Sequence, residues 1–300
     1  EFRRVLFRSA VVAAFEEMSR SSSSSRFSSS AKRGPSRTSL ALAAASATNS
    51  ARAAAKGGAR QSTNSVLMVS PTAFGFNAQA AEDNYFMHAN PGPGVMEDGS
   101  KAGEAGFSKE ETLSSKALRE FAGLHRALTD GAGVDVCLFE HSAGHGTPDA
   151  VFPNNWFSTH AGGHVALYPM YSPNRRLERR NDVIEMLKAQ YRLQDVIDYS
   201  GLEPDGLFLE GTGAMVLDHI ARVAYTARSN RANPIALERF ATHFNYEPLA
   251  FDAVDTQGRA VYHTNVLMCV ATEFALVGLD LIPDATRRAH VQQRLEETGR

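Results

Sequence analysis

Three short segments place polar side chains that can do chemistry inside runs of apolar residues. The segments are PDAVFPNNWF (148–157), FLEGTGAMVL (208–217) and VYHTNV (261–266). Their candidate site residues are Asp149, Asn154, Asn155, Glu210 and His263. Buried amides and carboxylates need hydrogen-bond partners, and the glycines after Glu210 let the backbone approach a ligand closely. Together the segments predict a site that holds a planar polar substrate and moves protons.

Each segment also has a purely structural interpretation. Asn154 and Asn155 could satisfy local backbone groups in a turn. Glu210 could belong to a structural ion pair. A histidine in an apolar strand, as predicted for His263, is often a hydrogen-bonded core residue. The residues by themselves leave both interpretations open.

Two histidine pairs raise a rival hypothesis, a zinc enzyme. His141 and His145 are four residues apart, as are His160 and His164, and imidazoles are common zinc ligands. Both intervening segments contain glycine, which disfavours a helix that presents two rings on one face. We therefore expect exposed loop histidines, no metal site and no cofactor. Stoichiometric zinc in the purified protein would overturn this expectation.

Alternating helices and strands must position these residues. Apolar residues at helical spacing predict helices, and short apolar runs between turn residues predict strands. Helices are expected at 109–129, 175–191, 234–243 and 285–296, and strands at 66–69, 134–140, 165–168, 196–199, 215–217, 222–225, 249–254 and 261–268. This alternation predicts an α/β protein built from repeated β/α units around a centre, not one doubly wound sheet.

The N-terminal segment differs in composition from the rest. Residues 1–60 carry 11 Lys and Arg against 3 Asp and Glu, and no acidic residue occurs from Met18 to Ala81. A basic, serine-rich and acid-poor segment is typical of an organellar transit peptide. We predict a disordered, transit-peptide-like segment at 1–62, with 1–17 a sequence artefact, and mitochondrial or plastid localisation. The alternative is a low-complexity tail without an address, on a cytoplasmic protein.

The remaining residues exclude several classes of partner. Because the whole chain carries −2 and residues 1–60 carry +8, residues 61–300 carry −10, which disfavours binding to nucleic acid. No run approaches the roughly 18 apolar residues that span a membrane, so we expect no membrane partner. Cys137 and Cys269 lie in apolar runs and are expected to be core thiols. The expected partner is a small molecule, and assembly into a homo-oligomer stays open.

Five longer motifs carry a resemblance to a known family. They are MVSPTAFGFNAQAAEDN, PDAVFPNNWFSTH, LYPMYSPNRRLERR, FLEGTGAMVLD and YHTNVLMC. In this order they resemble the amidinotransferase-related hydrolases typified by citrulline-utilisation hydrolase. These belong to the guanidino-group-modifying superfamily that includes arginine deiminase and dimethylarginine dimethylaminohydrolase. The resemblance extends from about Ser65 to the end of the sequence. It implies that residues 63–300 form a pentein domain, a five-bladed α/β propeller with a central cleft.

The resemblance also implies a reaction and roles for the candidate residues. A thiolate attacks the guanidinium or ureido carbon, ammonia or an amine leaves, and water resolves the covalent intermediate. His263 would be the general acid and base, and Glu210 would bind substrate N–H groups and orient His263. Asn155 would bind the same planar group, supported by Asn154 and Asp149. Because an amide both donates and accepts, this set suits the neutral ureido group of citrulline better than a guanidinium.

Two departures from the family pattern matter. The family carries its nucleophile in a GGGSxRC-type segment near the C-terminus, and no such segment occurs here. The pentein domain is therefore expected to lack its C-terminal portion, and this chain is expected to be inactive by itself. Ser70 also stands where relatives carry the arginine of an MVRP motif.

Neither cysteine is expected to replace the nucleophile. Cys269, on the same predicted strand as His263, would lie about 20 Å from it at roughly 3.3 Å per residue. Cys137 has apolar neighbours, which disfavour a thiolate. Two alternatives to a hydrolase stay open. One is an amidinotransferase, which passes the amidino group to an amine, and the other is a non-catalytic pentein that binds a guanidino compound.

Overall fold

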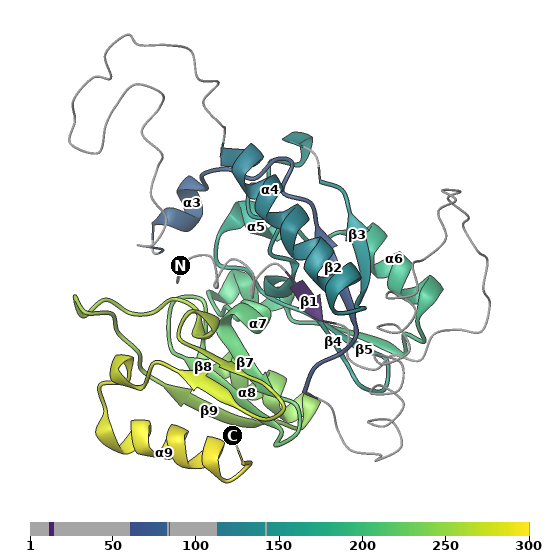
Figure 1. Cartoon of the computed structure of the whole chain (residues 1–300). Coiled ribbons are helices and arrows are strands. Elements are labelled where there is room, and N and C mark those ends of the chain that lie inside the picture. Colours follow the sequence, from purple (N-terminus) through teal and green to yellow (C-terminus); the bar gives the residue numbers. More distant parts are fainter. Residues whose placement is uncertain (1–11, 15–60, 83, 85–112, 142, 300) are drawn as a thin grey trace, which may run out of the picture.

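Strands and helices follow a repeating order in the computed structural model, which describes residues 12–14, 61–82, 84, 113–141 and 143–299 (Figure 1). The order is a strand, an antiparallel strand, a helix and a strand parallel to the second. A parallel pair needs a crossover connection, which the helix provides. The described strands form three sheets of three strands and one sheet of two. We number these groups as units one to four in chain order.

Units two and three show the complete order. Unit two consists of β4 (Phe157–His160), β5 (His164–Leu167), α6 (Asn181–Gln190) and β6 (Asp195–Asp198). Unit three consists of β7 (Met215–Asp218), β8 (Val223–Ala227), α8 (Pro234–Phe244) and β9 (Glu247–Phe251). In both units the first two strands form an antiparallel hairpin, and the third strand is parallel to the second. The middle strands, β5 and β8, are therefore paired on both edges.

Units one and four are variations of the same order. Unit one consists of β1 (Val12–Ala14), β2 (Ser65–Val69), α4 (Leu113–Arg126) and β3 (Asp135–Phe139). Unit four consists of β10 (Met268–Val270), β11 (Ala275–Val277) and α9 (Ala285–Glu296). β1 pairs antiparallel with β2, as β4 does with β5, and β10 pairs antiparallel with β11. Among the described strands, β11 has no parallel partner.

Short helical elements lie in the connections within and between the units. They are α3 (Ala78–Ala81), the π-helical turn η1 (Ala127–Gly131), the 3-10 turns η2 (Ala143–His145), η4 (Ser200–Asp205) and η6 (Leu279–Leu281), and α5 (Pro173–Arg176). β1 lies inside the segment 1–62 that was predicted to be disordered. Residues 1–11 and 15–60 lie outside the described residues, so the transit-peptide and localisation interpretations stay predictions.

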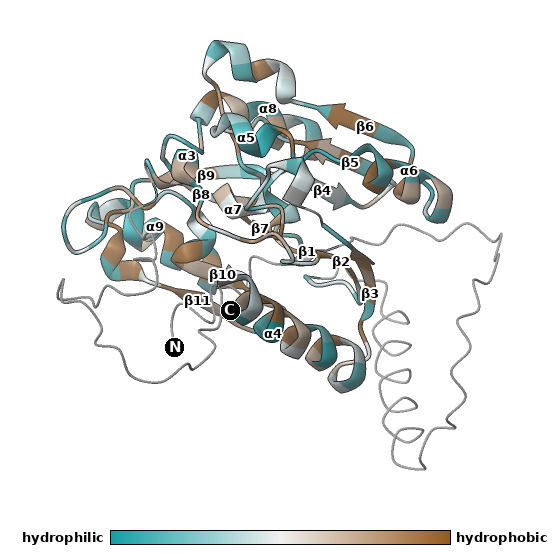
Figure 2. Cartoon of the chain, turned by 90° about the horizontal axis from the view of Figure 1, so that it is seen from above, coloured by the Kyte–Doolittle hydropathy of each residue, from teal (hydrophilic) through white to brown (hydrophobic). Residues whose placement is uncertain are grey.

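Apolar faces of the helices cover the sheets. Along α4, hydrophilic and hydrophobic residues alternate, as expected for a helix with one face on a core (Figure 2). α8 buries residues such as Leu237 and Phe240 in a cluster that also contains Ala166 of β5 and Met215 of β7. This shared cluster fixes unit two against unit three. It therefore also fixes the segments that lead into β4 and β7.

The α/β class is confirmed, but two element predictions were wrong. The expected helix 175–191 is divided into α5 and α6, because Arg176 and Arg179 turn back to bind backbone carbonyls of the segment before α5. The expected strand 261–268 is a loop and a turn, and only its last residue, Met268, lies in a strand. The Thr264 hydroxyl bends the chain here, since it accepts from Ala227 N and donates to Ala214 O. Short polar contacts of this kind leave no mark on an apolar pattern.

The burial of several residues also differs from expectation. Cys269 is exposed, because alternation along β10 turns Met268 toward the core and Cys269 away from it. His141 and His160 are buried, not exposed loop residues, and the His160 ring packs on Phe244 at 4.0 Å between centroids. No helix in the described part of the chain is long and apolar enough to cross a membrane. Within those same residues, no group of three or more His, Cys, Asp or Glu side chains could hold a metal ion.

Candidate active site

The three polar segments occupy equivalent places in the repeat. A single helical turn immediately precedes the first strand of units two, three and four. The turns are η3 (Pro153–Asn155), α7 (Gly211–Ala214) and η5 (Thr264–Val266). Glu210 is the residue in front of α7, and His263 is the residue in front of η5. α7 contacts both other turns, and it lies near the middle of the structure in Figure 1. The repeat therefore gathers residues that are distant in sequence.

Glycine is required in α7 because the neighbouring turns approach it so closely. A Cβ atom on Gly213 would lie 2.4 Å from the side-chain amide of Asn155 and 2.9 Å from His263 Nδ1. Gly211 has φ +46°, and its Cβ would lie 2.2 Å from Asn154 O. Asn155 and His263 thus flank the same glycine. The two glycines after Glu210 allow the three turns to meet.

Glu210 and His263 form a buried hydrogen-bonded pair. His263 Nε2 lies 2.8 Å from Glu210 Oε2, and Tyr171 N–H donates to Oε1 at 3.0 Å. Both side chains are nearly inaccessible, with Glu210 0% and His263 4% exposed. Arg231 and Arg175 lie 3.5 and 3.7 Å from Oε2. The pair therefore sits in a desolvated site with two guanidinium groups beside it.

These surroundings set the charge states of the pair. Burial acts to raise the pKa of Glu210, but Arg231, the bond from His263 and Arg175 outweigh it and hold that pKa far below its usual range. Burial lowers the pKa of His263, and the Glu210 carboxylate offsets this only in part. Glu210 is therefore ionised and His263 neutral at pH 7. Because a carboxylate only accepts, the imidazole proton is on Nε2, and Nδ1 presents a lone pair toward Gly213.

Arg175 connects the carboxylates of the site. It makes a bidentate ion pair with Glu178 at 2.8 and 2.9 Å, and its Nε lies 3.9 Å from Asp149 Oδ2. With the amide oxygen of Asn155 turned toward it, Arg175 Nη1 donates to that oxygen at 2.8 Å. Burial raises the pKa of Glu178 to about 7 against the pull of Arg175. Arg175 thus links Asn155, Asp149 and Glu210 in one network.

Two acceptor oxygens in this network have no donor. Asp149 Oδ2 accepts from Asn77 Nδ2 at 2.7 Å, but Asp149 Oδ1 and Asn154 Oδ1 are buried without a hydrogen-bond partner among the described residues. An unpaired buried acceptor is unfavourable by roughly 1–3 kcal/mol. A ligand with several N–H groups would satisfy both.

All five predicted site residues are buried in this network, and four further residues belong to it. The additional residues are Asn77, Arg175, Glu178 and Arg231. Arg175 and Glu178 fall in the motif LYPMYSPNRRLERR, where their spacing of three signals an ion pair on one face of a turn. Nothing in the sequence distinguishes Arg231 from the many exposed arginines. It was missed because only the fold buries it.

Neither cysteine is among the residues that contact Glu210 or His263 in the described part of the chain. Cys137 is half-buried in β3 opposite Leu67 of β2, and burial raises the pKa of its thiol. Cys269 is exposed on β10 opposite Leu276. A thiolate poised for attack needs neighbours that lower its pKa. We therefore assign the nucleophile to neither residue.

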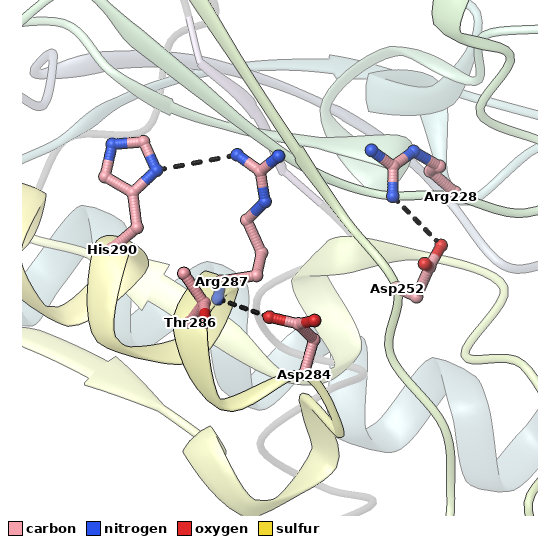
Figure 3. A pocket seen from close by; sticks show the side chains of 6 residues that line it. All are labelled: Arg228, Asp252, Asp284, Thr286, Arg287 and His290. Carbon is pink, nitrogen blue, oxygen red and sulfur yellow. Dashed lines mark hydrogen bonds and ion pairs between the residues drawn. The ribbon is translucent and has the colours of Figure 1, made fainter.

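An open pocket lies away from this network, at the carboxyl ends of β8 and β9 (Figure 3). Its volume is about 520 Å³, and it is lined by Arg228, Asp252, Asp284, Thr286, Arg287 and His290. Arg228 Nη1 lies 3.1 Å from Asp252 Oδ1, and Arg287 Nη1 lies 3.5 Å from His290 Nδ1. Asp284 caps α9 by accepting from Arg287 N. None of the predicted site residues lines this pocket.

Solved structures share the fold of this chain. The N-terminal domain of ArgZ bound to substrate, an arginine dihydrolase from the ornithine-ammonia cycle in cyanobacteria, matches with a TM-score of 0.54 and 18% identity. That match covers 77% of this chain and 72% of the ArgZ chain. AgrE in a ternary complex with ornithine and NAD+ matches with a TM-score of 0.55 and 20% identity, over 78% of this chain and 29% of the AgrE chain. No curated protein matches the chain.

A family match covers most of the sequence. Residues 70–300 match the family described as N,N dimethylarginine dimethylhydrolase, eukaryotic. The match contains all the residues of the network described above. It confirms the resemblance to guanidino-group-modifying enzymes that the five motifs carry. The chain belongs to the eukaryotic N,N dimethylarginine dimethylhydrolase family.

Proposed function

We propose that the buried network binds the guanidino group of an arginine-like compound for hydrolysis of a guanidino C–N bond. The observation that carries this proposal is the pair of unsatisfied acceptors, Asp149 Oδ1 and Asn154 Oδ1, in the network of the ionised Glu210. A guanidinium is planar and presents five N–H donors. It matches a site whose free positions are acceptors. Membership of the family supports the same class of reaction.

The charge balance favours a cationic guanidinium over a neutral ureido group. Arg175 compensates Glu178 through a bidentate pair, and Arg231 compensates Glu210. Asp149 is compensated less well, because Arg175 is 3.9 Å away and already paired with Glu178, and the close donor, Asn77, is neutral. A buried carboxylate that is only partly compensated becomes more favourable when a further cation joins it. The preference for citrulline rested on the amides alone and did not include these buried charges.

The roles proposed for the histidine and the glutamate follow from the hydrogen bond between them. His263 Nδ1 takes the proton of a thiol, and the thiolate forms an S–C bond to the guanidinium carbon. The imidazolium then protonates the departing nitrogen, the C–N bond breaks and an amine leaves. Nδ1 next takes a proton from water, whose oxygen attacks the same carbon as the C–S bond breaks. Glu210 holds the ring through Nε2 and stabilises its charged form.

We further propose that the units are blades of a five-bladed α/β propeller, with the network at its centre. Three described units share one strand order, and unit four begins in the same way. The turns before units two, three and four meet at α7. Meeting of equivalent turns is expected where blades surround a common axis.

Calorimetric titration of the purified chain with L-arginine, Nω,Nω-dimethyl-L-arginine and L-citrulline tests the binding proposal. We expect one of the cationic compounds to bind more tightly than citrulline. Asp149→Asn should weaken that binding by about tenfold or more, because it removes the carboxylate that is only partly compensated. Asp252→Asn, in the pocket of Figure 3, is the matched control and should bind as the original chain does.

Two results would contradict the proposal. Tighter binding of citrulline than of both cationic compounds would refute the charge argument. Absence of binding by all three compounds to a folded chain would refute the site itself. Release of ammonia or an amine is then measured with a chain that contains the nucleophilic thiol. With that chain, Glu210→Gln and His263→Ala should each abolish release.

A further inference from the structure

The segment between β5 and α5 presents a backbone N–H to Glu210, and its other peptide groups are held by other parts of the chain. The segment is 168–171 (YPMY). Pro169 O accepts from Leu209 N at 3.1 Å, and Tyr168 N donates to Trp156 O at 2.9 Å. Tyr171 N–H is the group that reaches Glu210 Oε1. The position of this one donor therefore depends on how the rest of the segment is held.

Three charged side chains hold the remaining peptide groups, and we call them the clamp. They are Arg176, Arg179 and Glu203. Arg179 Nη1 donates to Tyr168 O at 3.1 Å. Arg176 donates to Met170 O at 3.0 Å and to Tyr171 O at 3.3 Å.

Glu203 joins the clamp together. It accepts from Met170 N at 2.9 Å and forms a bidentate pair with Arg179 at 2.6 and 3.1 Å. Its Oε2 also lies 3.5 Å from Arg176 Nε. Glu203 comes from η4, after β6, whereas the arginines flank the end of α5. The clamp thus ties η4 and the end of α5 to the segment 168–171, whose Tyr171 N–H contacts Glu210.

We infer that the clamp is a positioning device for Glu210, which it orients through the N–H of Tyr171. This inference rests on the proposed function of Glu210 and His263. With Oε1 occupied by Tyr171 N–H, the carboxylate directs Oε2 at His263 Nε2. This bond keeps the imidazole proton on Nε2 and therefore leaves on Nδ1 the lone pair that the proposed reaction needs. The clamp residues themselves act through Glu210 and contact no reacting atom.

The geometry separates this role from that of an ordinary surface ion pair. Arg294 and Glu247 also pair at 2.7 Å, but their partners are each other and Glu297. The clamp instead binds consecutive peptide groups, with the Glu203 side chain only 10% exposed. Peptide groups that are held in place next to a buried carboxylate also fix the position of that carboxylate, because a small shift would break the short hydrogen bond between them. The clamp also explains two arginines of the motif LYPMYSPNRRLERR.

An NMR titration of the His263 ring tests the inference without requiring turnover. The ring signals are assigned from their loss in His263→Gln. The charged groups that face the ring are Glu210, Arg231 and Arg175, and the Tyr262 ring lies tilted beside it, with 4.7 Å between the ring centroids. Glu203→Ala should free Glu210 from Tyr171 N–H and weaken its bond to His263. Because that bond raises the pKa of His263, the pKa should fall further below its usual value. It should also shift the ring from the Nε2–H tautomer toward a mixture of both.

Control and conservative variants make the test decisive. Glu247→Ala removes a surface ion pair of similar geometry and should leave the His263 titration unchanged. Glu203→Gln retains an acceptor for Met170 N–H but loses the charge that holds the arginines, so a smaller change in the same direction is expected. An unchanged titration in folded Glu203→Ala would overturn the inference. If that variant does not fold, unchanged titrations in both Glu203→Gln and Arg179→Lys would overturn it.

Failure of the positioning inference can be distinguished from failure of the proposed function. Failure of the original chain to bind an arginine compound would refute the proposed function, whatever the titration shows. Binding of arginine with an unchanged titration in the clamp variants would refute the positioning role alone. A further readout comes from the chain that contains the thiol. There Glu203→Ala should reduce kcat and displace its pH profile with little change in KM.

Discussion

The candidate active-site network and the pocket of Figure 3 contain the same kinds of residue in opposite environments. Each has two arginines, one histidine and at least two carboxylates. The network lies among turns at the start of three units and is buried, whereas the pocket lies at the carboxyl ends of β8 and β9 and is open. Burial strengthens each electrostatic interaction and makes each unpaired group unfavourable. Residue types therefore indicate possible chemistry, but only desolvation couples them into one system.

The largest difference between the two regions should appear when an arginine is removed. Arg175→Ala leaves Glu178 and Asp149 buried without their cation, so we expect a loss of about 3–5 kcal/mol in the free energy of unfolding. Urea denaturation followed by circular dichroism measures this loss. Glu178→Gln in the same background should recover part of the stability, because the neutral amide removes one stranded charge. A loss below about 1 kcal/mol would show that water reaches the network.

Glycine substitutions should separate a crowded turn from an open surface. Gly213→Ala places a Cβ 2.4 Å from the side-chain amide of Asn155, so the turns must move apart. We expect a loss of roughly 1–3 kcal/mol from overpacking, together with loss of arginine binding. Gly123→Ala, in α4 with open space around the new Cβ, is the control. It should stabilise the protein by about 0.5–1 kcal/mol through helix propensity. Thermal melts and calorimetry of both variants check the contrast.

The buried histidine should make stability depend on pH. Because the folded state lowers the pKa of His263, the unfolded state binds more protons as pH falls below about 6.5. Stability from His263 is therefore complete above that pH and decreases as pH falls, by up to ~1.4 kcal/mol per pH unit. Glu178 acts in the opposite direction, since its raised pKa of about 7 removes stability as pH rises through 7.

A difference between variants isolates the histidine contribution. Unfolding free energies of the original chain and His263→Gln are compared between pH 5 and 8. The unfolding free energy of the original chain minus that of His263→Gln should increase as pH rises toward neutrality. For His290→Gln, in the open pocket, the unfolding free energy should depend on pH as it does for the original chain. A parallel curve for His263→Gln as well would mean that the ring is solvated.

The smallest effect is expected in the open pocket. Arg228 pairs with Asp252, whose side chain is 67% exposed. Arg228→Ala should therefore change the free energy of unfolding by about 0–1 kcal/mol, and added salt should reduce the difference further. Denaturation at low and high ionic strength measures both quantities. A loss comparable to that of Arg175→Ala would remove the contrast between the two regions.

Much of the fold was predictable because periodicity reflects burial. The α/β class, the helix at 234–243 and the strands of units two and three other than β4 follow from apolar spacing. The strand predicted at 261–268 failed because the Thr264 hydroxyl bonds to Ala227 and Ala214, both distant in sequence. Cys269 was misplaced because an apolar run does not show which face of a strand a neighbour covers. Contacts between distant residues decide both features.

Only the acidic, amide and histidine members of the candidate site that interrupt apolar runs were predictable, whereas Asn77, Glu178 and both arginines were not. Glu210, His263 and Asn155 interrupt apolar runs, so their desolvation is visible in the sequence. Arg175 and Arg231 are surrounded by other polar residues in the sequence, where arginine is normally solvated. Their burial results from the meeting of units two and three. That difference explains why the positive charges of the network could not be predicted from the sequence.

By itself, the sequence determined the chemistry available to this protein: polar groups in apolar runs, glycines after Glu210, alternating elements and the motifs of its family. These properties are local, because composition and spacing along the chain express them. Only the tertiary structure decided that three segments become equivalent turns that meet at α7, and that Asp149 lies 3.9 Å from an arginine already paired with Glu178. Burial and charge compensation depend on every neighbour in space, and those neighbours come from separate units of the fold.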